Sequence, residues 1–213
     1  MIFDISTERI NVGKFYIDKI AENPLPLDYR AVEYLQSSGT QYIDCSGLNM
    51  NQSDNGNYIE CKACESDDYS IFGYYQALNL TASDGYYRMY GYGNGRYNSD
   101  VPVGLATPHV FKLDAGNFYI DNTLKQTFST VVLGVGRDIR LFARSGSSMD
   151  IGGTVRIYYF KFGKIQNDAV VLQADMIPCV RISDDKPGMY DLVSRSFYTN
   201  SGTGEFATSE EAV

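Results

Sequence analysis

The chain has 213 residues, and its 26 aspartates and glutamates outnumber its 18 lysines and arginines, giving a formal net charge of −8. A chain of this length can bury a full core as one β domain, and it has no cluster of basic residues of the kind that binds a nucleic-acid backbone. Residues 1–5 lack the basic and apolar regions of a secretion signal, and no apolar run is long enough to span a membrane. We therefore expect one main domain, no nucleic-acid partner and no membrane insertion, in a protein that stays in the cytoplasm unless it leaves as part of a particle.

Glycine and aromatic residues are prominent along the whole chain. There are 20 glycines, 18 tyrosines and 11 phenylalanines, spread through short runs in which apolar and polar residues alternate. Aromatic residues favour strands, and glycine favours the tight turns that join strands. The sequence therefore predicts a nearly all-β protein without long helices.

Residues 1–26 differ from the rest of the chain. The run 10–20 alternates well enough to form a hairpin arm, and Pro24 and Pro26 then favour a stiff, extended joint. One interpretation is a separate N-terminal arm for attachment or oligomerisation. The other is an extra edge strand packed on the domain that follows, and the residues leave both open.

Strand candidates follow one another closely after this joint. Turns rich in Gly, Asn, Asp or Ser separate them and leave no room for crossover helices, so we expect a two-sheet antiparallel sandwich. We assign residues 27–208 to this sandwich and residues 209–213 to a tail. The predicted strands are 31–37, 41–45, 57–65, 69–76, 78–82, 86–92, 108–114, 117–121, 124–128, 138–145, 153–163, 169–182 and 188–199.

Two local features are predicted in more detail. Asp121 and Asn122 both tolerate positive φ and should form the turn of a hairpin. Residues 155–162 form a long aromatic strand with apolar residues of both parities, which predicts a central position in a sheet. Strict alternation would place Arg156 on the same face as Phe160.

Two groups of phrases at the two ends of the sandwich resemble a known family. Residues 32–44 read Val-Glu-Tyr-Leu-Gln-Ser-Ser-Gly-Thr-Gln-Tyr-Ile-Asp. Residues 177–181 read Ile-Pro-Cys-Val-Arg, and residues 188–204 begin Gly-Met-Tyr-Asp and end Phe-Tyr-Thr-Asn-Ser-Gly-Thr-Gly. Together they resemble the concanavalin A-like (laminin G-like) domain of phage tail, fibre and virion proteins and of surface proteins of gut bacteria. The resemblance covers roughly residues 27–208 and implies an antiparallel jelly-roll sandwich of the lectin/glucanase type, in which the first and last strands lie close.

Four cysteines are few for a disulfide scaffold, so we expect them to be reduced and mostly buried. Cys61 and Cys64 lie three positions apart in a strand pattern and should point to opposite faces. A zinc site would need two more ligands, and the chain has one histidine. The resemblance places Cys45 near the start of the domain and Cys179 near its end, so these two are the first pair to suspect if a disulfide exists.

Catalytic motifs are missing from the sequence. Enzymes built on the sandwich that the resemblance implies are chiefly glycan hydrolases, which place paired carboxylates on one strand in the pattern Glu-x-Asp-x-x-Glu. This pattern does not occur in the sequence. His109 is the only histidine and has no nucleophile motif beside it. The oxygen-rich loop 49–57 and the pair Asp184 and Asp185 lack the spacing of a known calcium loop. We therefore expect no enzymatic activity, no cofactor and no metal, with glycan hydrolysis kept only as a second alternative.

The strongest binding signal is the tract 86–97, which reads Tyr-Tyr-Arg-Met-Tyr-Gly-Tyr-Gly-Asn-Gly-Arg-Tyr. Tyrosine offers a flat apolar face for a sugar ring and a hydroxyl group, and Asn and Arg add planar polar partners. In a strand, the tyrosines and arginine at even positions would share one face. The alternative is an ordinary strand with half-buried tyrosines, and the lack of tryptophan counts against a dedicated carbohydrate module. The candidate carbohydrate-binding residues are Tyr86, Arg88, Tyr90, Tyr92, Asn94 and Arg96.

The resemblance implies a non-enzymatic phage virion protein, a tail, fibre or head-fibre component. Its N-terminal arm would contact other virion proteins, and its sandwich would bind carbohydrate on the bacterial surface. A homotrimer would suit such a fibre. The alternative is an adhesin or glycan-binding module at the bacterial cell surface.

Overall fold

The computed structural model describes residues 24–50, 56–66, 69–74, 78–91, 95–128, 137–144, 150–151 and 153–209. Over these residues the fold is all-β, with two antiparallel sheets packed as a sandwich, which confirms the predicted fold class. None of the described residues forms a helix that could cross a membrane. The strands are β1 (Tyr29–Ala31), β2 (Leu35–Gln36), β3 (Ile43–Met50), β4 (Asn57–Glu65), β5 (Ser70–Gly73), β6 (Asn79–Ser83), β7 (Tyr86–Tyr90), β8 (Arg96–Pro102), β9 (His109–Asp114), β10 (Asn117–Ile120), β11 (Thr123–Thr127), β12 (Arg137–Leu141), β13 (Ala143–Arg144), β14 (Asp150–Ile151), β15 (Val155–Gln166), β16 (Ala169–Arg181), β17 (Lys186–Asp191), β18 (Ser196–Thr199) and β19 (Ala207–Thr208).

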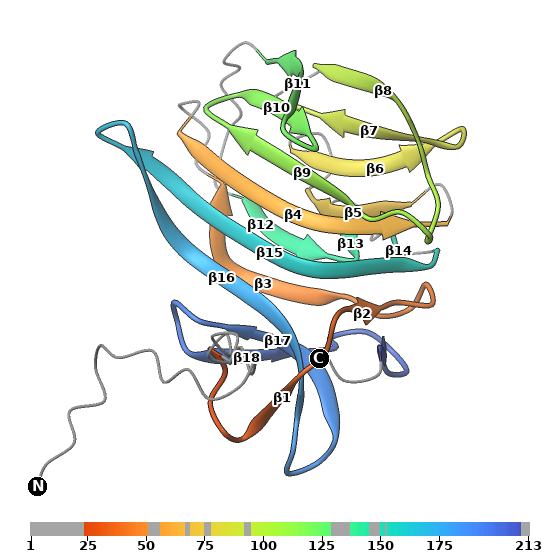
Figure 1. Ribbon diagram of the computed structural model, residues 1–213, viewed down its shortest axis with the longest axis vertical. Coiled ribbons are helices and arrows are strands. Elements are labelled where there is room, and N and C mark those ends of the chain that lie inside the picture. The colour runs from red at the N-terminus through yellow and green to blue at the C-terminus, as the bar shows by residue number, and fades with distance from the viewer. Residues whose placement is uncertain are drawn as a thin grey trace, which may run out of the picture.

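The larger sheet has the strand order β11-β10-β9-β4-β15-β16-β17-β18, with β1 beside β16 and β2 between β15 and β19. The smaller sheet has the order β3-β12-β5-β6-β7-β8, and β13 and β14 form a separate pair. Figure 1 shows the larger sheet in front of the smaller one. The pairing of β2 with β19 agrees with the expected closeness of the first and last strands.

The core lies between the two sheets and is filled by alternate residues of their strands. On β4 the buried residues Ile59, Cys61 and Ala63 point inward, and the residues between them are only partly covered. Aromatic rings from the two sheets meet edge to face, as between Phe72 and Phe160, whose centroids are 5.6 Å apart. Each large apolar side chain buried in this way stabilises the fold by about 1.5–3 kcal/mol.

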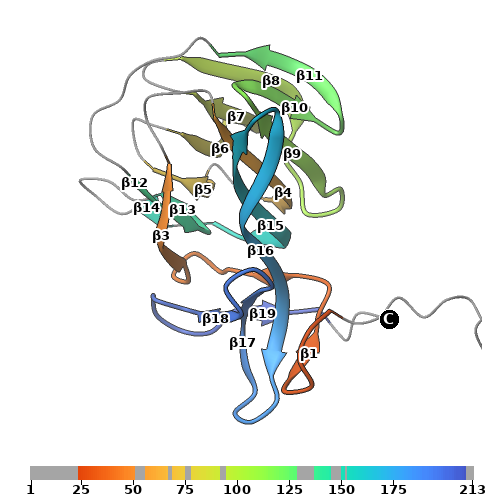
Figure 2. The ribbon, with the colours of Figure 1, turned by 90° about the vertical axis from the view of Figure 1, so that its left-hand side faces the viewer.

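A smaller cluster lies beside the main core, where β16 extends past the sandwich toward β1, β17 and β18 (Figures 1 and 2). Leu25, Cys179 and Tyr190 are buried together there, and the ring of Tyr29 lies 4.7 Å from that of Tyr190. Leu25 stands between the two prolines of the predicted joint, so this part of the joint packs on the larger sheet. The predicted arm, residues 1–23, lies outside the described residues.

Strand β15 is central, between β4 and β16, as predicted. The prediction that Arg156 shares a face with Phe160 is wrong. The β15–β4 register shifts between Ile157 and Tyr159, so an extra residue enters β15 at this bulge. Ile157 and Phe160 are therefore both buried, although strict alternation would put them on opposite faces.

The turns explain where the predicted strands were right and where they were not. Asp121 and Asn122 form the predicted hairpin turn with φ of 50° and 62°. The predicted strand 188–199 divides into β17 and β18 because a turn intervenes, in which Arg195 has a φ of 56°. Strand β8 was not predicted, since polar residues dominate its exposed face.

Candidate functional site

The predicted binding tract begins with β7, an inner strand of the smaller sheet. Tyr87 and Met89 are buried in the main core, whereas Tyr86, Arg88 and Tyr90 lie on the opposite face. Tyr86 is the most open of these residues, with 47% of its surface exposed. The predicted sidedness is therefore confirmed for this strand, because successive side chains of a strand point to opposite faces of its sheet.

Strand β8 completes this face. Arg96 lies directly opposite Tyr90, and Asn98 lies opposite Arg88. Both β8 residues are exposed, whereas Ser99 is buried. We call Tyr86, Arg88, Tyr90, Arg96 and Asn98 the β7–β8 face. Of the predicted candidates, Tyr92 and Asn94 lie outside the described residues.

Arg88, a member of the β7–β8 face, is held by an ion pair. Its guanidinium donates to the carboxylate of Asp84 in the turn that precedes β7, and 18% of its side chain is exposed. The Nε atom of Arg88 is buried without a hydrogen-bond partner among the described residues. Arg88 therefore anchors the turn. Tyr86, Arg96 and Asn98 are the exposed members of this face, and Tyr90 is partly exposed.

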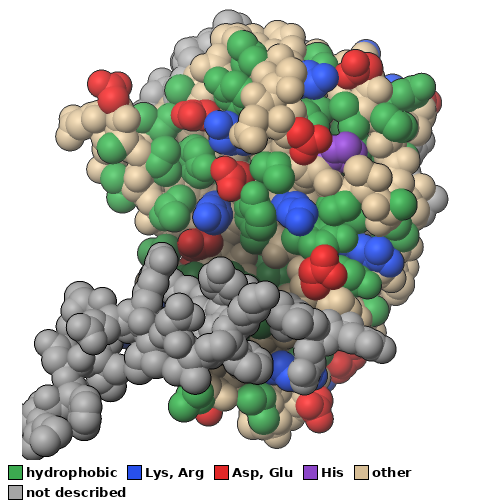
Figure 3. All heavy atoms as spheres, viewed as in Figure 1, with side chains coloured by type: hydrophobic (Ala, Val, Ile, Leu, Met, Phe, Trp, Pro, Cys, Tyr) green, Lys and Arg blue, Asp and Glu red, His purple; other side chains and the backbone are tan. Residues whose placement is uncertain are grey.

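A second tyrosine-rich surface lies on the outer face of the larger sheet, where Figure 3 shows side chains of the hydrophobic class, which includes tyrosine, interspersed with charges of both signs. Glu60 accepts hydrogen bonds from the hydroxyl groups of Tyr58 at 2.7 Å and Tyr159 at 3.1 Å. Cations lie over four tyrosine rings on or beside this face. The pairs are Lys62 over Tyr158 at 4.9 Å, Lys112 over Tyr119 at 4.5 Å, Arg156 over Tyr34 at 4.6 Å and Lys161 over Tyr159 at 5.7 Å.

These cations separate the two tyrosine surfaces chemically. Stacking of a sugar requires an open ring face, and a lysine or arginine already lies over one face of each of these four rings. Among the described residues, no cation lies over the ring of Tyr86 or Tyr90. Burial also raises the pKa of Tyr158 to about 12, so this hydroxyl stays neutral. The β7–β8 face is therefore the better stacking surface.

The phrases that carry the family resemblance meet in space. Residues 40–42 and 200–204 form what we call the clasp, in which backbone N–H groups of the second segment donate to the carbonyls of Tyr42 at 2.8 Å and Thr40 at 3.1 Å. The hydroxyl group of Thr40 donates a hydrogen bond of 2.9 Å to the carbonyl of Thr203 in the second segment. These phrases therefore close the sandwich and do not contribute to the β7–β8 face.

Asn200 organises the clasp with its side chain. Its Oδ1 accepts hydrogen bonds from the backbone N–H groups of Tyr42 at 3.1 Å and Gly202 at 2.8 Å, and its Nδ2 donates to the carbonyl of Gly204 at 2.8 Å. A Cβ atom at Gly202 would lie 2.1 Å from the carbonyl oxygen of Thr40. Glycine is required at this position because the two segments approach so closely.

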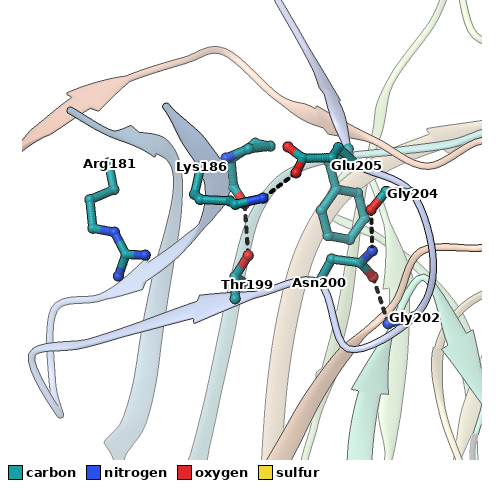
Figure 4. Close-up of a pocket in the computed structure, with 9 residues that line it drawn as sticks. Arg181, Lys186, Thr199, Asn200, Gly202, Gly204 and Glu205 are labelled. Carbon is teal, nitrogen blue, oxygen red and sulfur yellow. Dashed lines mark hydrogen bonds and ion pairs between the residues drawn. The ribbon is translucent and has the colours of Figure 1, made fainter. Parts of the chain in front are cut away.

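A pocket of about 280 Å³ opens beside the clasp (Figure 4). It is bordered by β17, β18 and the segment that follows β18, and Phe206 lies in its wall. No sequence pattern predicted this pocket, because Arg181, Lys186 and Glu205 come together only through the turns between these strands.

The titratable residues that were candidates for catalysis or metal binding form hydrogen bonds with neighbouring residues. The Nδ1 of His109 lies 2.7 Å from Asp121, whose other oxygen accepts the backbone N–H of Val110 at 2.9 Å. This pair holds the β10–β11 turn against β9. Among the described residues, no group of three or more His, Cys, Asp or Glu side chains could hold a metal ion. Asp184 instead receives two hydrogen bonds from Arg181.

All four cysteines are free and buried, as predicted. Cys45 lies in the main core, while Cys179 belongs to the smaller cluster with Tyr190, so the suspected pair is not joined. Burial raises the pKa of Cys179 to about 12 and also raises the pKa values of Cys45 and Cys61. Buried thiols with raised pKa values are poor nucleophiles and poor metal ligands.

Comparisons with known proteins support the fold. No family model matches the chain, and no curated protein matches it. A solved structure from Bacteroides ovatus ATCC 8483, described as a "putative carbohydrate binding protein", is similar with a TM-score of 0.53 and 12% sequence identity. The similarity covers 84% of this chain and 61% of the other, so this chain corresponds to less than two thirds of that protein. The similarity supports the antiparallel β-sandwich fold.

Proposed function

We propose that this chain is a non-enzymatic carbohydrate-binding protein that uses the β7–β8 face. The observation that carries the proposal is the position of the exposed Tyr86 and the partly exposed Tyr90 on one side of β7, with the exposed Arg96 opposite Tyr90. The rings supply flat apolar surface, and the guanidinium supplies planar donors for sugar hydroxyls. The carbohydrate-binding description of the Bacteroides ovatus protein with a similar fold adds support.

Strand pairing gives this face the rigidity that weak sugar binding needs. Tyr90 lies between Asn79 of β6 and Arg96 of β8, so its backbone is fixed on both sides. Binding then costs little loop ordering, since the side chains are presented by neighbouring strands. Tyrosine is suited to such a surface because it has few rotatable bonds for its contact area.

Substitution of Tyr86 and Tyr90 tests the proposal. The full chain is first screened against an array of bacterial polysaccharides and oligosaccharides, and the best binder is titrated calorimetrically. Tyr86→Ala and Tyr90→Ala should each weaken binding about tenfold, which corresponds to about 1.4 kcal/mol. Tyr119→Ala is the matched control, because its ring faces Lys112 on the other sheet. The proposal fails if no glycan binds, or if the control weakens binding as much as the two variants.

We further propose that the protein is displayed on a phage virion and recognises bacterial surface glycan. The support is the resemblance of residues 32–44 and 177–204 to phage tail, fibre and virion proteins. In this proposal the protein is made in the bacterial cytoplasm and is carried to its site on the particle. Residues 1–23 would contact other virion proteins, and a trimer would suit a fibre.

A bacterial surface glycan-binding module is the second candidate. It is favoured by the similarity to the Bacteroides ovatus structure. The two candidates differ in where the chain is found. Peptides of the chain should copurify with phage particles through a density gradient if it is a virion component, whereas recovery with the bacterial envelope supports the second candidate.

A further inference from the structure

The pocket beside the clasp has no part in the β7–β8 face. It lies on the larger sheet, at the end formed by β17 and β18, whereas β7 and β8 belong to the smaller sheet. Figure 4 shows Lys186 reaching across the pocket toward Glu205, with Thr199 and Asn200 on the opposite side. The pocket is therefore a separate candidate for a ligand.

The wall of the pocket is rigid. Asn200 and Gly202 are held by the hydrogen bonds of the clasp. Phe206 is only 4% exposed, and its ring lies 4.6 Å from that of Phe142 in the main core. A ligand would therefore meet a preformed surface, which lowers the ordering cost of binding.

The polar lining offers donors and acceptors in alternation. The ammonium group of Lys186 is paired with one oxygen of Glu205, and Arg181 uses its Nε and Nη2 for Asp184 at 2.9 and 2.6 Å. An ammonium has three N–H donors and a guanidinium has five, so both cations keep donors for a ligand. The second oxygen of Glu205 and the hydroxyl of Thr199 supply acceptors.

Each cation of the lining is already paired with a carboxylate, although Asp184, the partner of Arg181, does not itself line the pocket. Arg181 is matched by Asp184, and Lys186 is matched by Glu205, in a chain whose formal net charge is −8. An anionic ligand would meet cations that are already paired, the carboxylate of Glu205 and the negative charge of the whole protein. A hydroxyl group can donate and accept at once, which suits a lining of this kind. A volume of about 280 Å³ lies just below the range of pockets for drug-sized ligands and suits one sugar ring.

We propose that this pocket binds a single uncharged sugar ring, with Lys186 and Glu205 as its principal hydrogen-bonding residues. The inference rests on the proposed carbohydrate binding and adds a second subsite to it. The pocket and the β7–β8 face would then contact different parts of a branched glycan, or two different glycan chains.

Amide chemical shifts of the full chain, labelled with ¹⁵N, test this subsite. Glucose, galactose, mannose and N-acetylglucosamine are titrated separately, with glucuronic acid as the anionic comparison. At least one uncharged sugar should shift the amides of Thr199, Gly202 and Glu205 in a saturable way. Lys186→Met and Glu205→Gln should each raise the dissociation constant about tenfold, since each removes hydrogen bonds to a charged group.

Lys125→Met is the matched control, because Lys125 forms an ion pair with Asp100 on β8 and lies on β11, at the opposite end of the strand order from β18. It should leave the dissociation constant unchanged. The inference is overturned if no uncharged sugar shifts these amides, if Lys186→Met binds as the native chain does, or if glucuronic acid binds more tightly. Shifts confined to β7 and β8 would overturn the pocket and leave the proposed function standing, whereas shifts confined to the pocket would overturn the β7–β8 face instead.

Discussion

Replacing Asn200 with alanine should open the clasp. The substitution removes three hydrogen bonds, two accepted from the backbone N–H groups of Tyr42 and Gly202 and one donated to the carbonyl of Gly204. A hydrogen bond contributes about 0.5–1.5 kcal/mol net, and the one to Gly204 is exposed and contributes least. We therefore expect the free energy of unfolding to fall by about 2–3 kcal/mol. The Asn200→Ala chain should still fold, because the main core is unchanged.

Urea unfolding followed by tyrosine fluorescence measures this loss by linear extrapolation. Asn117→Ala is the matched control, because its side chain accepts one exposed hydrogen bond of 2.8 Å from Thr127. The control should lose less than about 1 kcal/mol. Equal losses in the two variants would refute the reasoning, since the clasp would then add nothing beyond an ordinary surface hydrogen bond. Gly202→Ala should be at least as damaging as Asn200→Ala, because its Cβ would overlap the carbonyl of Thr40.

Three further predictions concern the cysteines, the His109–Asp121 pair and the N-terminal segment. Native protein should resist thiol labelling, and denatured protein without reductant should label at all four cysteines; a count of two or zero would reveal a disulfide. Partial burial raises the pKa of Asp121, but the N–H of Val110 and the ring of His109 lower it by more, so the net shift is downward. The ionised carboxylate of Asp121 therefore stabilises the fold at pH values above its unfolded-state pKa of about 3.9. This stabilisation is lost as pH falls through the lower folded-state pKa. The difference in melting temperature between the native protein and the Asp121→Asn variant should therefore narrow below about pH 4. Deletion of residues 1–23 should leave a folded sandwich but abolish self-association or incorporation into particles, and a loss of several kcal/mol in stability would show instead that the segment is an integral strand.

Local patterns in the sequence predicted local structure well. The alternation in residues 86–90 predicted which side of β7 faces the core, because one face of an antiparallel strand is buried and the other is not. Asp121 and Asn122 predicted a hairpin because both tolerate positive φ. Alternation failed at β15, where the bulge near Tyr158 reverses the parity of the residues from Tyr159 to Phe162, and no residue type marks such a bulge.

Compared with the local structure, the candidate sites depended more on contacts between segments that are distant in the sequence. Arg96 and Asn98 join the β7–β8 face only through the pairing of β8 with β7, and strand 96–102 reads as polar because its exposed face is polar. The pocket depends on the turn between Arg181 and Lys186 and on the path of the chain after β18. The phrases at residues 32–44 and 200–204 both carried the family resemblance, and residues 40–42 and 200–204 of these phrases close the fold as the clasp.

The pairing of β2 with β19 also bears on when the protein can fold during its synthesis. Leu35 and Gln36 leave the ribosome early, but their partners Thr208 and Ala207 are among the last residues of the sandwich to emerge. Contacts between such distant segments slow folding, because a long loop must close before they form. The strands synthesised first would therefore keep unpaired edges until their partner strands have been synthesised. Chaperones that cover such edges should increase the yield of soluble protein.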